Sequence, residues 1–180
     1  MVTAPGRVRA GKASTVAIML GVAVVIVVAD VISKNLVLRK LPLGHRPVRL
    51  LDGLITLKLL FNSGAAFGLG TSYTVLIALI ACGVVVVVIR TARRLRSVAW
   101  AIALGLLLGG ATGNLSDRLF RAPAPFRGRV VDWINLPHFP WTFNIADASI
   151  VCAAALIAIL ALLGKPLDGP RADDDARTAE

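Results

Sequence analysis

The stretch Ala13–Ala29, ASTVAIMLGVAVVIVVA, contains no charged residue and ends directly before Asp30. Three further stretches are uncharged and of similar length: Tyr73–Ile89, Val98–Gly113 and Ala148–Gly164. At about 1.5 Å per residue, a helix of this length nearly crosses a hydrocarbon layer of roughly 30 Å. Because lipid offers no partners for backbone N–H and C=O groups, such a stretch must form a helix. The sequence therefore predicts four transmembrane helices.

The composition of the whole chain agrees with a membrane protein. Of its 180 residues, 57% are hydrophobic and 17% charged, and the mean hydropathy is +0.78, which excludes an ordinary soluble domain. In a soluble protein the net charge of +10 would suggest a nucleic-acid partner. Here basic loops beside lipid explain the charge, so we expect no nucleic-acid partner. Cys82 and Cys152 lie within apolar stretches and predict neither a disulfide nor a metal site.

The fold class that we expect is an all-α polytopic membrane protein with four transmembrane helices. A single integral-membrane domain covers residues 1–164, and residues 165–180 form a disordered cytoplasmic tail. The expected helices, extended into their apolar neighbours, are about 13–37, 71–90, 98–118 and 145–164.

The first helix has an alternative interpretation as a cleaved signal peptide, because Arg7, Arg9 and Lys12 precede it. The apolar stretch is longer than the hydrophobic region of a typical signal peptide, and no A-x-A-like cleavage site follows it. A retained transmembrane helix is therefore favoured.

Two segments predict structure beyond single helices. Val48–Phe61 has two apolar, partly β-branched runs around the turn-forming Asp52 and Gly53, which predicts a small β-hairpin at the membrane surface. Gly105, Gly109 and Gly113 form two overlapping G-x-x-x-G steps on one helix face, which predicts close helix packing.

The charges only weakly predict the orientation in the membrane. Four helices place the longer segments, about Leu38–Ser72 and Leu115–Asp147, on one side, where nine Lys and Arg residues lie; ten lie on the other side. The four arginines within the short link 90–97 favour a cytoplasmic link, whereas Arg39 and Lys40 argue for the opposite orientation. Cytoplasmic termini are the favoured arrangement.

Ionisable residues inside the apolar stretches are costly, so each is a candidate for function. Asp30 and Lys34 are four residues apart on one helix face, where they can neutralise each other as a structural or a functional pair. At the end of the third helix, Asn114 precedes Asp117 and Arg118, which by themselves could be a helix-end charge pair.

Two aspartates stand in apolar or aromatic surroundings: Asp132 in VVDWI and Asp147 in FNIAD. An N-terminal capping role explains Asp147 alone. The two are fifteen residues apart, so a returning loop can bring them face to face. Close carboxyl groups share one proton near neutral pH, which is the state that an aspartyl protease needs to activate water.

Five motifs occur together in an order that resembles prolipoprotein signal peptidases (signal peptidase II), a family of aspartyl peptidases. The matching pieces are Asp30 with Ser33-Lys34, NSGAAFG from Asn62, GGATGNLSDR from Gly109, VVDWI from Val130 and FNIADASI from Phe143. Two features depart from the family pattern: the longer connection Leu119–Arg129, and Trp133 in place of the more common phenylalanine.

The resemblance implies a bacterial inner-membrane aspartic endopeptidase with cytoplasmic termini and an active site at the outer leaflet surface. It would remove signal peptides from prolipoproteins by cutting N-terminal to a diacylglyceryl-modified cysteine. The implied catalytic pair is Asp132 and Asp147. The implied substrate-binding residues are Asn62, Gly64, Asn114, Arg118 and Asn144, and the implied supporting residues are Asp30, Lys34, Asp117 and Ala146.

The same resemblance implies a monomer without cofactor or metal, whose partners are diacylglyceryl-modified prolipoproteins and membrane phospholipids. Other classes remain as alternatives. A serine protease would rely on Gly70–Tyr73 with His45 or His138. A metalloprotease is less favoured, because this sequence contains no H-E-x-x-H motif. A transporter would use Asp30 and Lys34, and an inactive scaffold would use none of these residues.

Overall fold

The structure is a computed structural model that describes residues 12–41, 44, 46–64, 72–123 and 125–169. It contains four long helices: α1 (Lys12–Lys40), α2 (Ser72–Thr91), α3 (Val98–Phe120) and α4 (Ile145–Leu162). All four are long and apolar enough to cross a membrane. The predicted transmembrane helices are therefore confirmed, and the largest difference in their bounds is the end of α1, which continues to Lys40.

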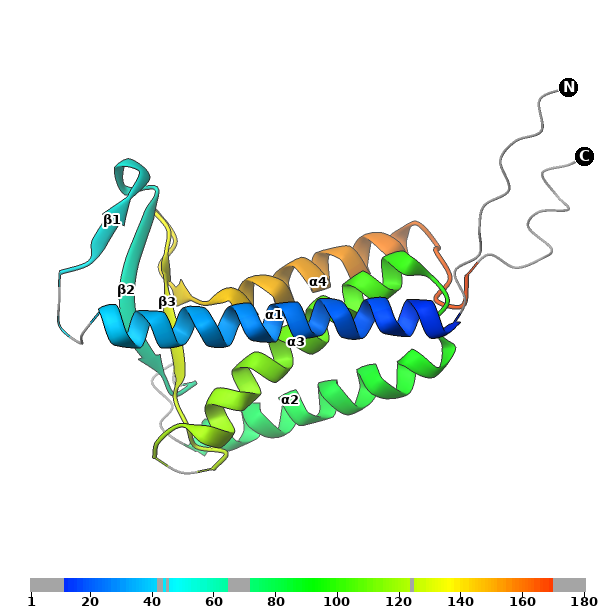
Figure 1. The fold of residues 1–180 in the computed structure, drawn as a ribbon, viewed down its shortest axis with the longest axis horizontal. Coiled ribbons are helices and arrows are strands. Elements are labelled where there is room, and N and C mark those ends of the chain that lie inside the picture. The colour runs from blue at the N-terminus through cyan, green and yellow to red at the C-terminus, as the bar shows by residue number, and fades with distance from the viewer. Residues whose placement is uncertain (1–11, 42–43, 45, 65–71, 124, 170–180) are drawn as a thin grey trace, which may run out of the picture.

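A four-stranded antiparallel sheet closes one end of the helix bundle (Figure 1). Its strands, in spatial order, are β1 (Val48–Leu50), β2 (Ile55–Asn62), β3 (Val130–Asn135) and β4 (Thr142–Phe143). The predicted hairpin is confirmed as β1 and β2, which are joined by a short 3-10 turn, η1 (Leu51–Gly53).

The sequence analysis did not predict β3 and β4. Strand β3 pairs with β2, and paired residues such as Phe61 and Val131 are far apart in the chain. Its short apolar stretch gains its extended form from this distant partner, a tertiary effect that local patterns do not carry. The additional strands place Asp132 on a sheet that lies against the end of the bundle (Figure 1).

Helix α3 is the central helix, because it contacts each of the other three. Its glycines allow this close approach. A Cβ added at Gly105 would lie 2.7 Å from the carbonyl oxygen of Met19 on α1, and one at Gly110 would lie 2.5 Å from that of Ala146 on α4. The packing role predicted for the glycine face is confirmed for Gly105, Gly109 and Gly113, which all lie against α1.

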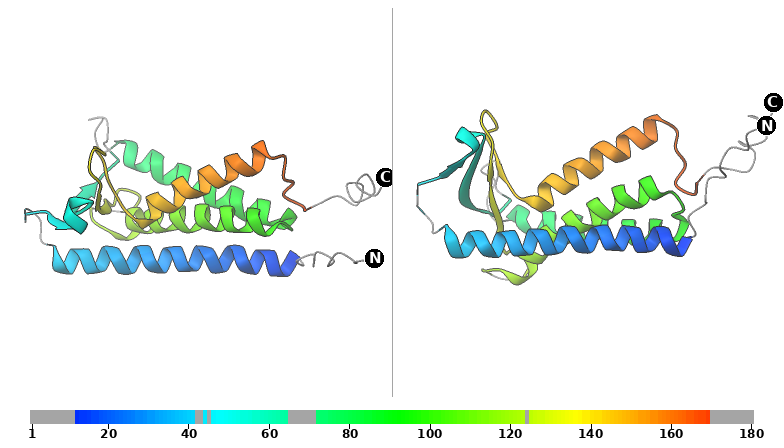
Figure 2. Two further views of the ribbon diagram at one scale, coloured as in Figure 1. Left: turned by 90° about the horizontal axis from the view of Figure 1, so that it is seen from above. Right: turned by 45° about the horizontal axis from the view of Figure 1, so that its top comes forward.

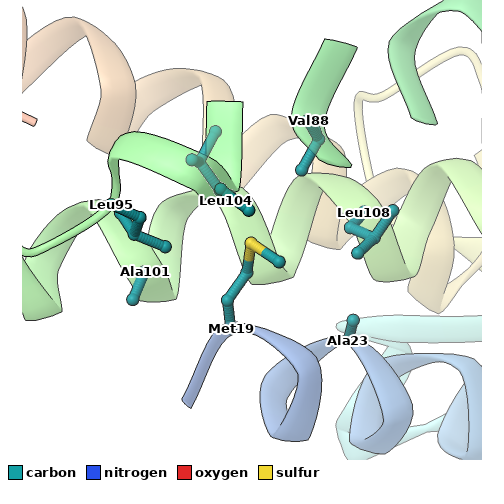
Figure 3. Packing of buried hydrophobic residues seen from close by; sticks show 8 residues of the cluster. Met19, Ala23, Val88, Leu95, Ala101, Leu104 and Leu108 are labelled. Atoms are coloured by element: carbon teal, nitrogen blue, oxygen red, sulfur yellow. The ribbon is translucent and has the colours of Figure 1, made fainter. Parts of the chain in front are cut away.

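The half of the bundle away from the sheet has an apolar core (Figure 3). Met19 of α1 points toward Leu104 of α3, and Val88 of α2 completes the contact between the three helices. The other members of this core are Ala23, Ala92, Leu95, Ala101 and Leu108. The buried charged residues all lie in the half of the bundle beside the sheet.

The start of α1, the α2–α3 connection and the chain after α4 all lie at the end opposite the sheet (Figure 2). The connection includes a second 3-10 turn, η2 (Ala92–Arg94). The carbonyl oxygen of Leu167 accepts hydrogen bonds from the backbone N–H groups of Arg96 and Ser97, at 3.1 and 3.2 Å. The side chain of Leu167 also packs against the apolar core. Residues 165–169 are therefore ordered, in contrast to the predicted disordered tail. Residues 170–180 lie outside the described residues.

The contact between α1 and α3 predicts a packing effect at Gly109. A Cβ there would lie 2.7 Å from Cβ of Ile26, so Gly109→Ala should destabilise the protein by about 1 to 3 kcal/mol. Gly83→Ala on α2 is the matched control, because its Cβ would meet nothing within 4 Å. Thermal unfolding in micelles measures both variants. Equal midpoints for the two would contradict the described packing.

Candidate active site

The ammonium group of Lys34 lies at the centre of a buried polar cluster between α1 and α3. Its side chain is 0% exposed, and Nζ lies 2.6 Å from Oδ2 of Asp30 and 2.9 Å from Oδ2 of Asp117. Nζ also donates to Oδ1 of Asn114, at 3.1 Å. Three oxygen atoms thus lie within 3.1 Å of the ammonium group, and two of them belong to carboxylates that balance the charge of a buried cation. The predicted Asp30–Lys34 pair is present, with two further partners.

The two carboxylates bound to Lys34 also hold other elements in place. Oδ1 of Asp30 accepts from the backbone N–H of Ala146 at the start of α4, at 3.0 Å. Oδ2 of Asp117 accepts from the backbone N–H of Val131 on β3, at 3.2 Å. Helix α1 therefore fixes the start of α4, and α3 fixes β3.

Asp117 pairs with a different arginine from the one that the sequence suggested. Its Oδ1 forms an ion pair with Nε of Arg121, one helical turn further along α3. The described part of the chain contains no ion pair between Asp117 and Arg118. The reason is geometric, because adjacent residues of a helix point in directions about 100° apart, whereas residues four apart share a face.

Asp132 is buried on β3 and is held from two sides. Its Oδ2 accepts from Nδ2 of Asn62 on β2, at 2.9 Å, and its Oδ1 accepts from Nδ2 of Asn144, at 2.7 Å. The side chain of Asn62 is itself fixed, because its Oδ1 accepts from the backbone N–H of Gly64 at 2.8 Å. The β2–β3 pairing thus brings Asn62 and Asp132 together.

Asp147 lies in the first turn of α4 and is half-buried. The N-cap of this helix is Asn144, not Asp147, and the two form a reciprocal capping box. Oδ1 of Asn144 accepts from the backbone N–H of Asp147 at 2.9 Å, and Oδ2 of Asp147 accepts from that of Asn144 at 3.2 Å. The other carboxylate oxygen, Oδ1, accepts from Nδ2 of Asn114 at 2.7 Å.

Asn114 and Asn144 connect the two aspartates to the Lys34 cluster. Nδ2 of Asn144 donates both to Asp132 and to Oδ1 of Asn114, the latter at 3.1 Å. Asn114 has its oxygen toward Lys34 and its nitrogen toward Asp147. The asparagines predicted to bind substrate therefore contact the aspartates directly, and their contact with a substrate stays a prediction.

The surroundings of Asp132 favour its protonated form. The pKa of Asp132 is raised from 3.8 to about 6, chiefly by burial; the nearby charge of Asp147 adds to this rise, and the hydrogen bonds from Asn62 and Asn144 oppose it. The charge of Lys34 also lowers it. Two carboxyl groups in one network cannot both ionise easily, so this arrangement is suited to holding one proton between them.

Arg118 is a buried cation beside this pair. Its Nη1 donates to the carbonyl oxygen of Asn114 at 3.3 Å, and its Nε has no hydrogen-bond partner among the described residues. Its charge interacts electrostatically with Asp147 and Asp132. One guanidinium and two carboxyl groups that share one proton sum to zero charge, which is the least costly state in a buried site.

A cavity of about 860 Å³ opens beside Asp147 between the sheet and α4. Asn62 and Asp147 contribute polar atoms, and the remaining walls are largely apolar. The aromatic residues Phe139, Trp141 and Phe143 line the cavity, and the rings of Phe139 and Phe143 meet edge to face at 5.9 Å. This aromatic wall was not predicted, although the aromatic cluster HFPWTF at 138–143, shortly before Asp147, could have indicated it.

The loop that follows β2 is described only in part. Gly64 has φ of +85°, and a Cβ there would lie 2.6 Å from Cδ1 of Ile77 on α2, so glycine is required for both reasons. Residues 65–68 of the NSGAAFG motif lie outside the described residues, as do Gly70 and Thr71 of the serine-protease alternative.

Four spanning helices, a sheet at one end and two aspartates in one buried network define a membrane peptidase of the aspartic type. The family model described as signal peptidase (SPase) II matches residues 22–163, and the chain belongs to this family. The chain is thus a multi-pass bacterial membrane protein that removes signal peptides. Family membership also sets aside the serine-protease, metalloprotease and transporter alternatives.

Individual relatives agree with this assignment. The lipoprotein signal peptidase of Streptomyces coelicolor is 47% identical over 166 residues, which cover 92% of this chain and 79% of the relative. That of Streptomyces griseus is 50% identical over 151 residues, covering 84% and 76%. A solved bacterial membrane enzyme, determined by the in meso method, superposes with a TM-score of 0.70 at 25% identity, covering 80% of this chain and 92% of that one.

The Lys34 cluster predicts a large loss of stability when the cation is removed. Lys34→Met leaves the carboxylates of Asp30 and Asp117 facing each other without their shared cation, which should cost about 3 to 5 kcal/mol. The exposed Lys58→Met is the control and should change stability by about 0.5 kcal/mol or less. Denaturant titration in micelles measures both, and similar losses for the two variants would argue against a central role for Lys34.

Proposed function

We propose that Asp132 and Asp147 form a catalytic dyad that cleaves prolipoproteins N-terminal to a diacylglyceryl-modified cysteine. The main support for the proposal is the shared hydrogen-bond network. In it, the side chain of Asn144 donates to Asp132 and forms the capping box of α4 with Asp147. The substrate class is supported by the relatives, which are lipoprotein signal peptidases. The cavity beside Asp147 offers the dyad an apolar approach.

The environments of the two carboxyl groups support different roles. Burial is the main cause that raises the pKa of Asp132 to about 6, so Asp132 is the partner that holds the shared proton below about that pH. Asp147 is half-buried, lines the cavity and accepts two hydrogen bonds, so it is the ionised partner that meets water. The nearby charge of Arg118 stabilises the remaining negative charge.

Hydrolysis then proceeds without a covalent intermediate. Asp147 takes a proton from water while the water oxygen attacks the scissile carbonyl carbon, and Asp132 gives its proton to the carbonyl oxygen. When the tetrahedral intermediate collapses, the C–N bond breaks and the leaving nitrogen takes the proton from Asp147. The hydroxyl proton returns to Asp132, which restores the starting state of the dyad.

The position of the dyad suits a lipid-anchored substrate. The acyl chains of a diacylglyceryl cysteine stay in the bilayer, so the bond must be cut near the membrane surface, where α4 begins and the sheet closes the bundle. We infer that this end faces the outer leaflet and that both termini are cytoplasmic. The arginines at 90, 93, 94 and 96, at the opposite end, support this orientation by the positive-inside rule.

Replacement of either aspartate tests the dyad. Asp132→Asn and Asp147→Asn should each lower the rate of cleavage by about 100-fold or more, because each substitution removes one of the two groups that transfer protons. Asp52→Asn in the exposed turn η1 is the matched control and should keep the native rate. The assay is cleavage of a diacylglyceryl-modified prolipoprotein in micelles. Near-native cleavage by either dyad variant would refute the assignment.

The pH dependence of cleavage tests the shared proton. Because the pKa of Asp132 is raised to about 6, the free dyad should lose its proton above about that pH, and kcat/KM should fall on the alkaline side. A rate that is flat across this range would mean that no proton is shared.

The cavity is tested by filling it beside Asp147. Ala148→Phe should lower kcat/KM by about tenfold or more, because the added ring occupies the space beside the dyad. Ala155→Phe, two helical turns further along α4 and outside the cavity lining, is the control. If both variants keep the native kcat/KM, the cavity is not the approach to the dyad.

A further inference from the structure

A second cavity, of about 610 Å³, lies at the sheet end of α1 and α3. It is distinct from the cavity beside Asp147, since the two linings have only Phe61 in common. Its lining comes from the end of α1, from β2, and from the end of α3 with the loop that follows. The lining residues are Leu38, Phe61, Phe120, Arg121, Ala122, Pro123 and Arg129.

The lining combines apolar walls with two cations. Leu38, Phe61 and Phe120 are large apolar residues, and Phe120 is 85% exposed although it ends a transmembrane helix. Arg121 uses Nε for Asp117 and Nη2 for Asn35, at 3.5 Å, which leaves its Nη1 for a ligand.

Arg129 is exposed and makes no ion pair within the described part of the chain. The cavity therefore offers two sets of guanidinium donors: the Nη1 group of Arg121, whose charge is paired with Asp117, and the guanidinium of Arg129, which no carboxylate of the described residues neutralises. A phosphate group suits such donors, because guanidinium groups bind phosphate oxygens in a bidentate manner.

The location of the cavity selects the kind of ligand. The cavity is lined by residues at the ends of α1 and α3. These helix ends lie beside the sheet (Figure 1), so the apolar walls are next to the membrane-spanning part of the helices. A free phosphate would leave these walls uncovered. The diacylglyceryl group of the proposed substrate has no phosphate and would leave the arginines without a partner.

We propose that this cavity binds an anionic phospholipid of the membrane, apart from the dyad. The phosphate contacts Arg121 and Arg129, and an acyl chain lies along Leu38, Phe61 and Phe120. The bound lipid would hold the loop that follows α3 against the sheet beside Asp117, the residue that fixes β3. This site does not depend on the proposed cleavage chemistry.

Lipid binding by the full-length protein in micelles tests the site. Native mass spectrometry compares dioleoyl phosphatidylglycerol with zwitterionic dioleoyl phosphatidylcholine, and the native protein should prefer the former. Arg129→Gln should weaken phosphatidylglycerol binding about fivefold, which corresponds to ~1 kcal/mol for one cation at the membrane surface. Arg127→Gln changes the same charge in the same loop outside the cavity lining and should keep the native affinity.

A second variant distinguishes the contribution of the cavity's space from that of its positive charge. Ala122→Trp fills the space without removing a cation and should also weaken phosphatidylglycerol binding. Thermal unfolding checks that the variants stay folded, and glycerol phosphate should fail to compete for the site.

Equal losses of phosphatidylglycerol affinity in Arg127→Gln and Arg129→Gln would mean that the lipid is attracted only by the general positive charge of the loop, which would overturn the proposal. Equal binding of the two lipids by the native protein, or native affinity in Ala122→Trp, would do the same. None of these results bears on the cleavage assay, so the two proposals fail separately.

Discussion

The ammonium group of Lys34 is surrounded by lipid-spanning helices, and its desolvation would cost several kcal/mol without partners. Its three acceptors, on Asp30, Asp117 and Asn114, are therefore required. Each acceptor residue then reaches a second element: the start of α4, the backbone of β3, and the side chain of Asp147, respectively. The satisfaction of one buried cation thus fixes the relative positions of the elements that carry the two aspartates.

Charge balance accounts for the state of the dyad. The cluster of Lys34 and Arg121 with Asp30 and Asp117 is neutral, and so is Arg118 with two carboxyl groups that share a proton. Neither group leaves net charge in the buried end of the bundle. In the proposed mechanism, the proton that takes part in hydrolysis is therefore also the proton that lowers the cost of burying the two carboxyl groups. The asparagines fix where the carboxyl oxygens lie without adding charge of their own.

The parts of the structure that the sequence predicts are those with a local cause. Uncharged stretches of helix-spanning length predict α1 to α4, and the spacing of Asp30 and Lys34 predicts their pair. Strand β3 depends on a partner about 70 residues away, and the partner of Asp117 depends on helix geometry. Motif resemblance named Asn114 and Asn144, but their hydrogen bonds to the aspartates appear only when α3, β3 and α4 are brought together.

In the proposed mechanism, Asp132 and Asp147 hold one proton between them. Infrared difference spectroscopy across pH detects the carbonyl stretch of a protonated carboxyl group directly. We expect one such band that titrates near pH 6 in the native protein and is absent from the same region in Asp132→Asn. A native protein with no protonated carboxyl group just below that pH, or a band that is unchanged in both Asp132→Asn and Asp147→Asn, would contradict it.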